Sequence, residues 1–559
     1  MKLLIISMGF LAVGYTYGQK VSWQKNVGSG TQDFLSGLAV TIDGQYLVSG
    51  SSIQKSQDPT VLDNQNKGYD YHILKFDQQG QKVWEKYFSG NQHDYLSSTV
   101  STQEGGFLLA GTSYSSLALD KKQESNGSCD MWLIKLDEDG EEEWQRTIGT
   151  RYSEEARSVT QTTDKGFVVV GSTNHPKFGY GSKDVMVVKL DKAGNIINQL
   201  TLGGNGLDEI EKVVPTTDGG VLMGIYSRSG IFQGQSRPKI NSKMFDLTAS
   251  PLSASSGNNN SSTSNDQNPT KSYDINFYGK AYGNYGEGDY WVVKLDKDGM
   301  VQWEKNFGGR EDDHIRTMAL TETGYIIGGE SMSGTSGNKT AKMEEGSDLW
   351  LLSLDQDGNE EWQRSYNFKN RDVLMSLNTI KNSSSETKGF LIGGYTQSEG
   401  KVQKDDETFW MLYIDRNGKE VWRKYVEGKE KKNEERLVSA ILNRDGSYVL
   451  AGTSADELGK ENWKIVKFED KQIEDLIESK EIQIYPNPVK DYCYVEIGLD
   501  FESADIYVYD MTGKMIQQLN TNYKVTKVNT SKLPQGVYII KANISTQQNK
   551  KLITKIVKE

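Results

Sequence analysis

The sequence predicts an all-β protein, in which a seven-bladed β-propeller is followed by a small C-terminal β-sandwich. Three observations lead to this fold class. One hairpin-like sequence motif recurs at intervals of about 60 residues. Each return carries four strand-like runs separated by turn residues, and the two ends of the repeated part hold complementary pieces of one unit. Domains are therefore expected at 1–18, 19–470, 471–481 and 482–559.

The repeated phrase is a β-hairpin with an Asp-x-Asp-Gly type of turn. MWLIKLDEDGEEEWQRTIGT at 131–150 returns as YWVVKLDKDGMVQWEKNFGG from Tyr290 and as LWLLSLDQDGNEEWQRSYNF from Leu349. The tryptophan after the turn recurs at Trp23, Trp84, Trp144, Trp303, Trp362 and Trp422. Another copy starts at Val185, where Asn198 takes the place of the tryptophan, so the chain holds seven copies.

Each full unit contains four strand-like runs, which we call A, B, C and D in chain order. In the unit that begins at Asp130 they read MWLIKLD, EEEWQRTIG, ARSVTQTTD and FVVVGST. The A–B and C–D connections contain glycine, which supplies the positive φ that tight hairpins need. Four antiparallel strands in each unit are typical of a propeller blade.

The ends of the repeated part predict how the propeller closes. The chain enters the repeats with a B run, SWQKNVG from Ser22, and leaves them with an A run, WKIVKF at 463–468. Together these runs complete one blade and leave no open sheet edge. The pattern, over roughly 21–470, resembles the kelch-like and delta-60-like propeller repeats of exported bacterial proteins. The resemblance implies the fold and no particular activity.

The first residues are expected to be a secretory signal peptide that is cut between Gly18 and Gln19. Lys2 precedes an apolar run at 3–13, and small residues stand before the cut, as such peptides require. No other stretch has the roughly 18 apolar residues that a membrane-spanning helix needs.

The repeats contain no pattern that requires a cofactor, and none is expected. The A–B turns, such as Asp296-Lys297-Asp298-Gly299, hold carboxylates that suit either a plain hairpin turn or, as the alternative, calcium. An acid before each C run is expected to accept backbone N–H groups of the B–C turn. These acids are Asp33, Asp94, Glu154, Asp208, Asp312, Asp372 and Glu435. The net charge of −12 argues against nucleic acid as a partner.

The longest insertion covers about 230–287, between a D run and an A run, and is expected to be a loop that the fold does not need. Its middle is rich in Ser and Asn. Its end carries Phe277, Tyr278, Tyr282 and Tyr285, whose rings suit contact with a sugar or a protein. These four are candidate ligand contacts on the face that the B–C and D–A connections share. The alternative is a solvated loop that varies in length.

Residues 482–559 follow a charged linker, 471–481, and read as short strands with Gly, Pro and Asn turns, which predicts a β-sandwich. The motif residues are Tyr485, Pro486, Asn487, Pro488, Gly513, Lys514, Gly536, Tyr538 and Lys555. With them this part resembles the type A C-terminal sorting domain of the type IX secretion system. The resemblance implies the secretion machinery as a partner. It also implies export through the periplasm to the outer surface of a Gram-negative bacterium, with the protein released or attached there.

The first interpretation of function is a secreted or cell-surface binding and adhesion module for glycan or protein. The alternatives are an extracellular glycan hydrolase or lyase that acts at the propeller centre, and a structural scaffold. A charged cluster at one end of the central channel would favour the enzyme, whereas aromatic residues on the long loops would favour binding. A monomer is expected.

Overall fold

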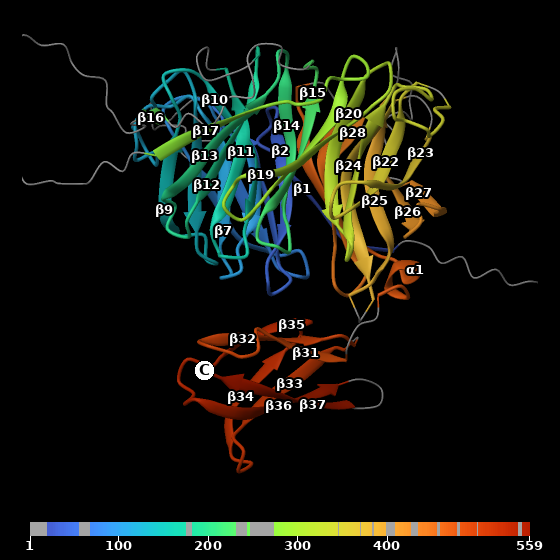
Figure 1. The fold of residues 1–559 in the computed structure, drawn as a ribbon. Helices are drawn as coiled ribbons and strands as arrows, with labels where there is room; N and C mark the ends of the chain where they lie inside the picture. The colour runs from blue at the N-terminus through green and yellow to red at the C-terminus, as the bar shows by residue number, and fades with distance from the viewer. Residues whose placement is uncertain are drawn as a thin grey trace, which may run out of the picture.

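The structure is a computed structural model of an all-β protein (Figure 1). It describes residues 20–54, 68–174, 181–230, 243–245, 273–344, 346–368, 371–382, 385–397, 409–425, 434–455, 459–477, 481–499, 501–545 and 550–559. Within these residues the repeats form seven sheets, antiparallel except for one parallel pair, and the C-terminal residues form two more.

Every repeat sheet has the strand order C-D-A-B. The first three are β2 (Phe34–Val40), β3 (Tyr46–Ser52), β4 (Asp70–Phe76) and β5 (Lys82–Phe88); β6 (Asp94–Ser101), β7 (Phe107–Ser113), β8 (Asp130–Leu136) and β9 (Glu142–Ile148); β10 (Glu154–Gln161), β11 (Phe167–Thr173), β12 (Asp184–Leu190) and β13 (Ile196–Gly203). The next three are β14 (Asp208–Pro215), β15 (Val221–Ser227), β18 (Asp289–Leu295) and β19 (Val301–Phe307); β20 (Asp313–Leu320), β21 (Gly324–Ser331), β22 (Asp348–Asp355) and β23 (Glu360–Tyr366); β24 (Arg371–Lys381), β25 (Thr387–Gln397), β26 (Phe409–Asp415) and β27 (Glu420–Tyr425).

The seventh sheet joins the two ends of the repeated part, as the complementary runs predict. It consists of β28 (Glu434–Leu442), β29 (Tyr448–Ala455), β30 (Asn462–Glu469) and β1 (Lys20–Val27). β1 pairs antiparallel with β30, from Lys20 opposite Glu469 to Val27 opposite Trp463. Trp463 is fully buried in a cluster with Leu35 and Val48 of the neighbouring sheet. The pairing of the first and last repeat strands is confirmed.

The C strands bring the seven sheets together. β2, β6, β10, β14, β20, β24 and β28 contact one another in this order, and β28 also contacts β2. Each of them has a bulge, and the extra residues are Ser36, Ser97, Arg157, Glu211, Arg316, Met375 and Val438. A bulge changes the direction of a side chain. These seven equivalent positions, where the sheets meet, carry very different residues.

The recurrent tryptophan joins five of the seven sheets to the turn of the next sheet. Trp23 lies over the turn glycine Gly80, and its Nε1 donates to the Gln78 carbonyl at 3.2 Å. The turn glycines have φ from 75° to 82°, and an added Cβ at Gly80 would lie 2.7 Å from the Trp23 ring. Trp303 and Trp362 make the same bond to the Gln356 and Arg416 carbonyls. Glycine is thus required both for the turn and for this close approach.

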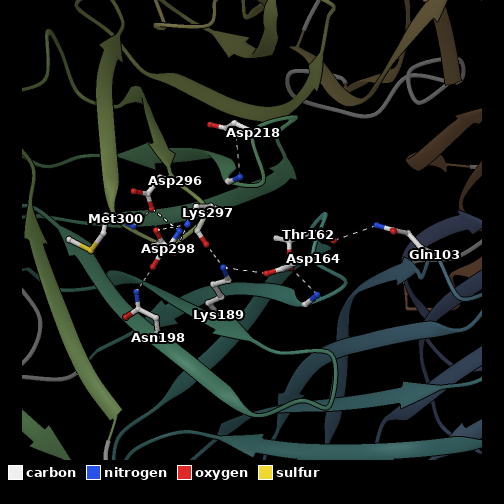
Figure 2. A network of polar contacts seen from close by, with 12 residues as sticks. Gln103, Thr162, Asp164, Lys189, Asn198, Asp218, Asp296, Lys297, Asp298 and Met300 are labelled. Atoms are coloured by element: carbon white, nitrogen blue, oxygen red, sulfur yellow. Dashed lines mark hydrogen bonds and ion pairs between the residues drawn. The ribbon is translucent and has the colours of Figure 1, made fainter.

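Two joints differ. Next to Trp422 the sheet has β30 and β1 in place of an A–B hairpin, and at the other joint the insertion supplies the contact. β17 (Tyr273–Gly279) pairs parallel with β13, and β16 (Lys243–Phe245) pairs with β17, so this sheet has six strands. Asn198 in the tryptophan slot accepts a hydrogen bond from Asn276 of β17 and donates to the Asp298 carbonyl at 3.1 Å. Figure 2 shows this joint, where Lys189 also reaches the Lys297 carbonyl and Asp164.

The expectation that the whole of 230–287 is a loop is therefore wrong, and whether the fold needs this segment stays untested. β17 extends a sheet, and Lys280 just after it is 2% exposed. The Lys280 Nζ donates to the Ser227 hydroxyl at 2.7 Å and to the Ser229 carbonyl at 3.3 Å. Burial lowers the pKa of Lys280 to about 8. Replacing the full insertion would remove these contacts; residues 231–242 and 246–272 lie outside the described part of the chain.

The C-terminal part consists of two sheets that pack over one core. β31 (Ile482–Tyr485), β32 (Tyr492–Ile497) and β35 (Val525–Asn529) form the first. β34 (Met515–Thr521), β33 (Ser503–Tyr509), β36 (Gly536–Ser545) and β37 (Lys550–Lys558) form the second. A short helix, α1 (Lys471–Glu474), lies in the expected linker. Val495 and Val528 of the first sheet share the core with Ile506 and Ile540 of the second.

The first C-terminal sheet lies against the A–B and C–D turns of the repeats (Figure 1). The Tyr492 hydroxyl donates to the Glu104 carbonyl at 2.7 Å, and the Gln78 amide donates to the Val525 carbonyl at 3.2 Å. Lys527 pairs with Glu138. These tight turns therefore face the C-terminal part, and the B–C and D–A connections lie at the opposite end of the strands.

Candidate functional site

The turn aspartates use their oxygens within the hairpins. Asp296 Oδ1 accepts the N–H groups of Asp298 and Met300, both at 2.9 Å (Figure 2). The same two bonds recur at Asp77, Asp137, Asp191, Asp355, Asp415 and, in the C-terminal part, Asp510. The described residues contain no group of three or more His, Cys, Asp or Glu side chains that could hold a metal ion. A calcium site at these turns stays an untested alternative.

The acids near the start of six C strands hold the B–C turns, as expected; the turn before Glu435 lies outside the described residues. Asp94 accepts the Gly90 N–H at 2.8 Å and Asp208 accepts the Gly204 N–H at 2.7 Å. One assignment needs correction: Asp313, not Asp312, fills this position, because it accepts the Gly309 N–H at 2.6 Å. These carboxyls are buried and structural.

One of these acids gives a test by pH. Burial raises the pKa of Asp372 from 3.8 to about 7, and hydrogen bonds from the Phe368 N–H and the Thr396 hydroxyl only partly oppose this. The folded protein thus holds a proton that the unfolded chain releases. The protonated Asp372 carboxyl therefore adds to the free energy of unfolding. Its contribution is complete below about pH 4 and is lost as the pH rises to about 7.

Asp372→Asn cannot ionise. Between pH 4 and pH 8 the wild type loses this contribution and the variant does not. The free energy of unfolding of the variant should therefore rise relative to that of the wild type, by about 4 kcal/mol at most. Urea unfolding of both proteins at several pH values measures this. A difference in stability that stays constant with pH would contradict the account.

The candidate contacts in the insertion differ in burial. Phe277 and Tyr278 lie on β17, and Tyr278 packs against the core of the neighbouring sheets. Tyr282 and Tyr285 are 56% and 50% exposed, whereas Phe277 and Tyr278 are partly buried. A role of these four residues in ligand binding stays a prediction. The predicted cleavage residues Gly18 and Gln19 lie outside the described residues.

Five rings from four segments meet at the end of the strands that faces away from the C-terminal part. We call Phe34, Tyr69, His93, Tyr95 and Tyr114 the aromatic patch. Ring centroids are 5.0 Å apart for Phe34 and Tyr69, 5.5 Å for Tyr69 and Tyr95, and 6.2 Å for Tyr95 and Tyr114. Phe34 and Tyr114 are 38% and 39% exposed. Such a group of partly exposed rings marks a binding surface more often than a fold requirement.

A cavity of about 320 Å³ continues from the patch along the C strands, and we call it the C-strand pocket. Tyr95 and Tyr114 belong to both. Its charged lining residues are Glu155, Arg157, Lys183, Glu209 and Glu211. This volume lies at the lower end of the range of small-molecule sites.

Every carboxylate that lines the pocket already contacts a cation. Lys183 Nζ lies 2.9 Å from Glu155 and 3.1 Å from Glu209. Arg157 lies 2.6 Å from Glu211, which also receives a 3.0 Å hydrogen bond from His314 Nε2. The pocket thus offers alternating donors and acceptors.

The electrostatics at Glu211 keep it ionised. Burial by itself would raise the pKa of Glu211, but the hydrogen bond from His314 and the charges of Arg157 and Arg316 outweigh burial and lower the pKa to about 2. Arg316 in turn bonds to Glu330 at 2.8 Å, and this carboxylate raises the pKa of Arg316 against the effect of burial. An ionised carboxylate can bind a ligand and orient neighbouring side chains, but it holds no proton to donate near neutral pH.

Sequence reasoning missed both the patch and the pocket. The residues come from different repeats, and several occupy equivalent positions: Phe34, Tyr95, Glu155 and Glu209 lie at the same place near the start of their C strands. The sequence shows these residue types but not that they meet in one place. One usable signal was charge at the bulge positions. Three C strands carry Arg157, Glu211 and Arg316 there, whereas the other four carry Ser36, Ser97, Met375 and Val438.

The motif residues of the C-terminal part mostly serve its fold. Tyr485 donates to the Ile42 carbonyl of the repeats at 3.3 Å, and the Asn487 side chain bonds to the backbone of Lys555 and Val557. Tyr538, 6% exposed, donates to the Pro534 carbonyl at 2.8 Å.

The remaining motif residues lie at turns, at strand ends and on the surface. Pro486 and Pro488 flank Asn487 after β31. Gly513, with φ of 86°, and Lys514 belong to the Asp510 turn. Gly536 begins β36, and the Lys555 side chain is exposed on β37.

Comparison with known proteins supports one part of the chain. Residues 483–559 match the model of the secretion system C-terminal sorting domain. This match indicates a protein that the type IX system secretes and attaches to the cell surface in Bacteroidetes. Among the described residues, no helix is long and apolar enough to cross a membrane. A comparison with curated proteins finds no match.

Several solved structures are distantly similar. They include polysaccharide lyase Uly1, at 8% identity over 81% of this chain and 99% of that chain, with a TM-score of 0.41. A protein of unknown function from Dyadobacter fermentans is 8% identical over 81% and 100%, with a TM-score of 0.36. Sqt1 from Chaetomium thermophilum is 10% identical over 78% and 87%, also at 0.36. At these TM-scores the similarities carry no argument about function.

Proposed function

We propose that residues 19–470 form a seven-bladed β-propeller of the kelch-like type, closed by a blade that β1 and β30 share. The strand order C-D-A-B in all seven sheets supports this proposal. The contacts of each C strand with the next one, and of β28 with β2, support it as well. The propeller would carry its ligand site on the face that points away from the sorting domain.

We infer that the protein is a surface-attached binding module for a saccharide. The observation that carries this proposal is the aromatic patch beside the polar C-strand pocket. Tyrosine rings offer rigid apolar faces for a sugar ring. Sugar hydroxyls both donate and accept hydrogen bonds, which fits the alternating groups of the pocket. Because each pocket carboxylate already contacts a cation, the site favours an uncharged saccharide over an ion.

The test compares two pairs of tyrosines in the mature full-length protein. In an array of neutral and charged glycans, the wild type is expected to bind neutral glycans. Tyr95→Ala with Tyr114→Ala is expected to weaken this binding about 30-fold to 700-fold, because each lost aromatic contact costs about 1–2 kcal/mol. Tyr282→Ala with Tyr285→Ala is the matched control on the insertion and should bind like the wild type. Loss of binding only in the control pair would move the site to the insertion.

A glycan-cleaving enzyme is the second candidate. The observation that favours it is the pair formed by His314 and Glu211 beside the pocket, because a histidine held by a carboxylate is a common general base. The His314 ring also stacks on Tyr226 with centroids 4.0 Å apart. Mass spectrometry of bound glycans after prolonged incubation distinguishes the two candidates. Shortened products that disappear in His314→Ala would assign an enzyme.

A further inference from the structure

The second C-terminal sheet has one buried face and one open face. Ile506, Val508, Ile540 and Ile556 point into the core and are fully buried. The residues between them point outward, and this alternation follows from the period of two in a β-strand. The open face is unusual for a surface because Ile553 is 64% exposed.

Strand register collects apolar and basic side chains on this open face. Tyr507 lies opposite Lys541, which lies opposite Ile553. In the next outward-facing row, Tyr509 lies opposite Ile539, which lies opposite Lys555. Val537 pairs with Val557, and these two are 40% and 44% exposed. We call Tyr507, Tyr509, Val537, Ile553, Lys555 and Val557, together with Lys541 and Lys551, the outer face.

The other sheet of the domain is already engaged. Tyr485, Tyr492 and Lys527 of the first sheet contact the repeat turns. Figure 1 shows the second sheet, β34-β33-β36-β37, on the side away from the repeats. While the domain is held in this way, a partner that must recognise it meets the outer face first.

The charges of the outer face define the partner. The chain as a whole has a net charge of −12, yet Lys541, Lys551 and Lys555 gather here and outnumber Asp505, which lies in the row of Lys551 and accepts a hydrogen bond from Asn520. None of these three lysines forms an ion pair with a carboxylate in the part of the chain that the structure describes. The face therefore fits an apolar strip flanked by carboxylates, and a second copy of this acidic chain is a poorer match.

We propose that the type IX export machinery binds the sorting domain at this outer face, through an acidic surface with an apolar centre. Isoleucine and valine side chains that cost free energy in water are buried in that complex. The lysines steer the encounter and set the orientation. The proposal does not depend on the ligand of the repeats.

The experiment measures export of the full chain in a Bacteroidetes cell with a working type IX system. Ile553→Ser with Val557→Ser is expected to reduce surface-exposed protein at least tenfold and to leave the protein inside the outer membrane. Val83→Ser with Val421→Ser is the matched control, because these valines are 50% and 54% exposed on the repeats. The control should reach the surface normally.

A second variant separates recognition from folding. Lys541→Gln, Lys551→Gln and Lys555→Gln change no buried contact, so the melting temperature should stay the same while export falls. Normal surface levels in both outer-face variants would overturn the proposal. If, in addition, light scattering shows that the wild type is a dimer and the outer-face variants are monomers, the face binds a second copy of the chain.

Discussion

A chain that ends at Glu461 is expected to lose the folded state of the repeats. It lacks β30, which buries Trp463, Ile465, Val466 and Phe468. Full burial of such side chains contributes about 1.5–3 kcal/mol each, so the loss is on the order of 6–12 kcal/mol. This equals the whole stability of a typical domain, which is about 5–15 kcal/mol. β1 also loses its only paired strand among the described residues.

Circular dichroism during heating and size-exclusion chromatography check this result. The truncated chain should melt far below the control or aggregate through its open strand edges. The matched control is a chain that ends at Lys480 and so keeps β30 and α1. Equal melting temperatures and monomeric profiles for the two chains would refute the idea that β1 and β30 close the repeats.

The chain that ends at Lys480 is expected to fold and yet fail to reach the cell surface. Its contacts with the sorting domain are polar groups at turns, such as the Tyr492 bond to Glu104 and the pair of Arg444 with Glu496. Water replaces such contacts at a cost of about 0.5–1.5 kcal/mol each. Export depends on the sorting domain that residues 483–559 match. Cell fractionation should find at least tenfold less protein on the surface.

The control for this experiment is the full chain expressed in the same cells. Melting of the purified truncated protein separates a failure to fold from a failure to be exported. Normal surface levels of a folded, truncated chain would contradict the role of the tail in sorting.

The sequence by itself determined the repeat, its strands and the sorting domain. These features are local: a turn aspartate bonds to N–H groups two and four residues ahead, as at Asp296, and strand alternation has a period of two. The pairing of β1 with β30 was also predictable, because two incomplete sheets carry unpaired backbone groups that only each other can satisfy.

Only the tertiary structure decided where a ligand site lies. Phe34, Tyr69 and Tyr95 become neighbours through the packing of separate segments, and no spacing in the sequence records that distance. The insertion shows the same limit, since its aromatic end paired with β13 as strand β17. A segment becomes an added strand because its backbone pairs with the free N–H and C=O groups at the edge of an existing sheet. Its own composition does not reveal this choice, and therefore Phe277 and Tyr278 read as loop residues.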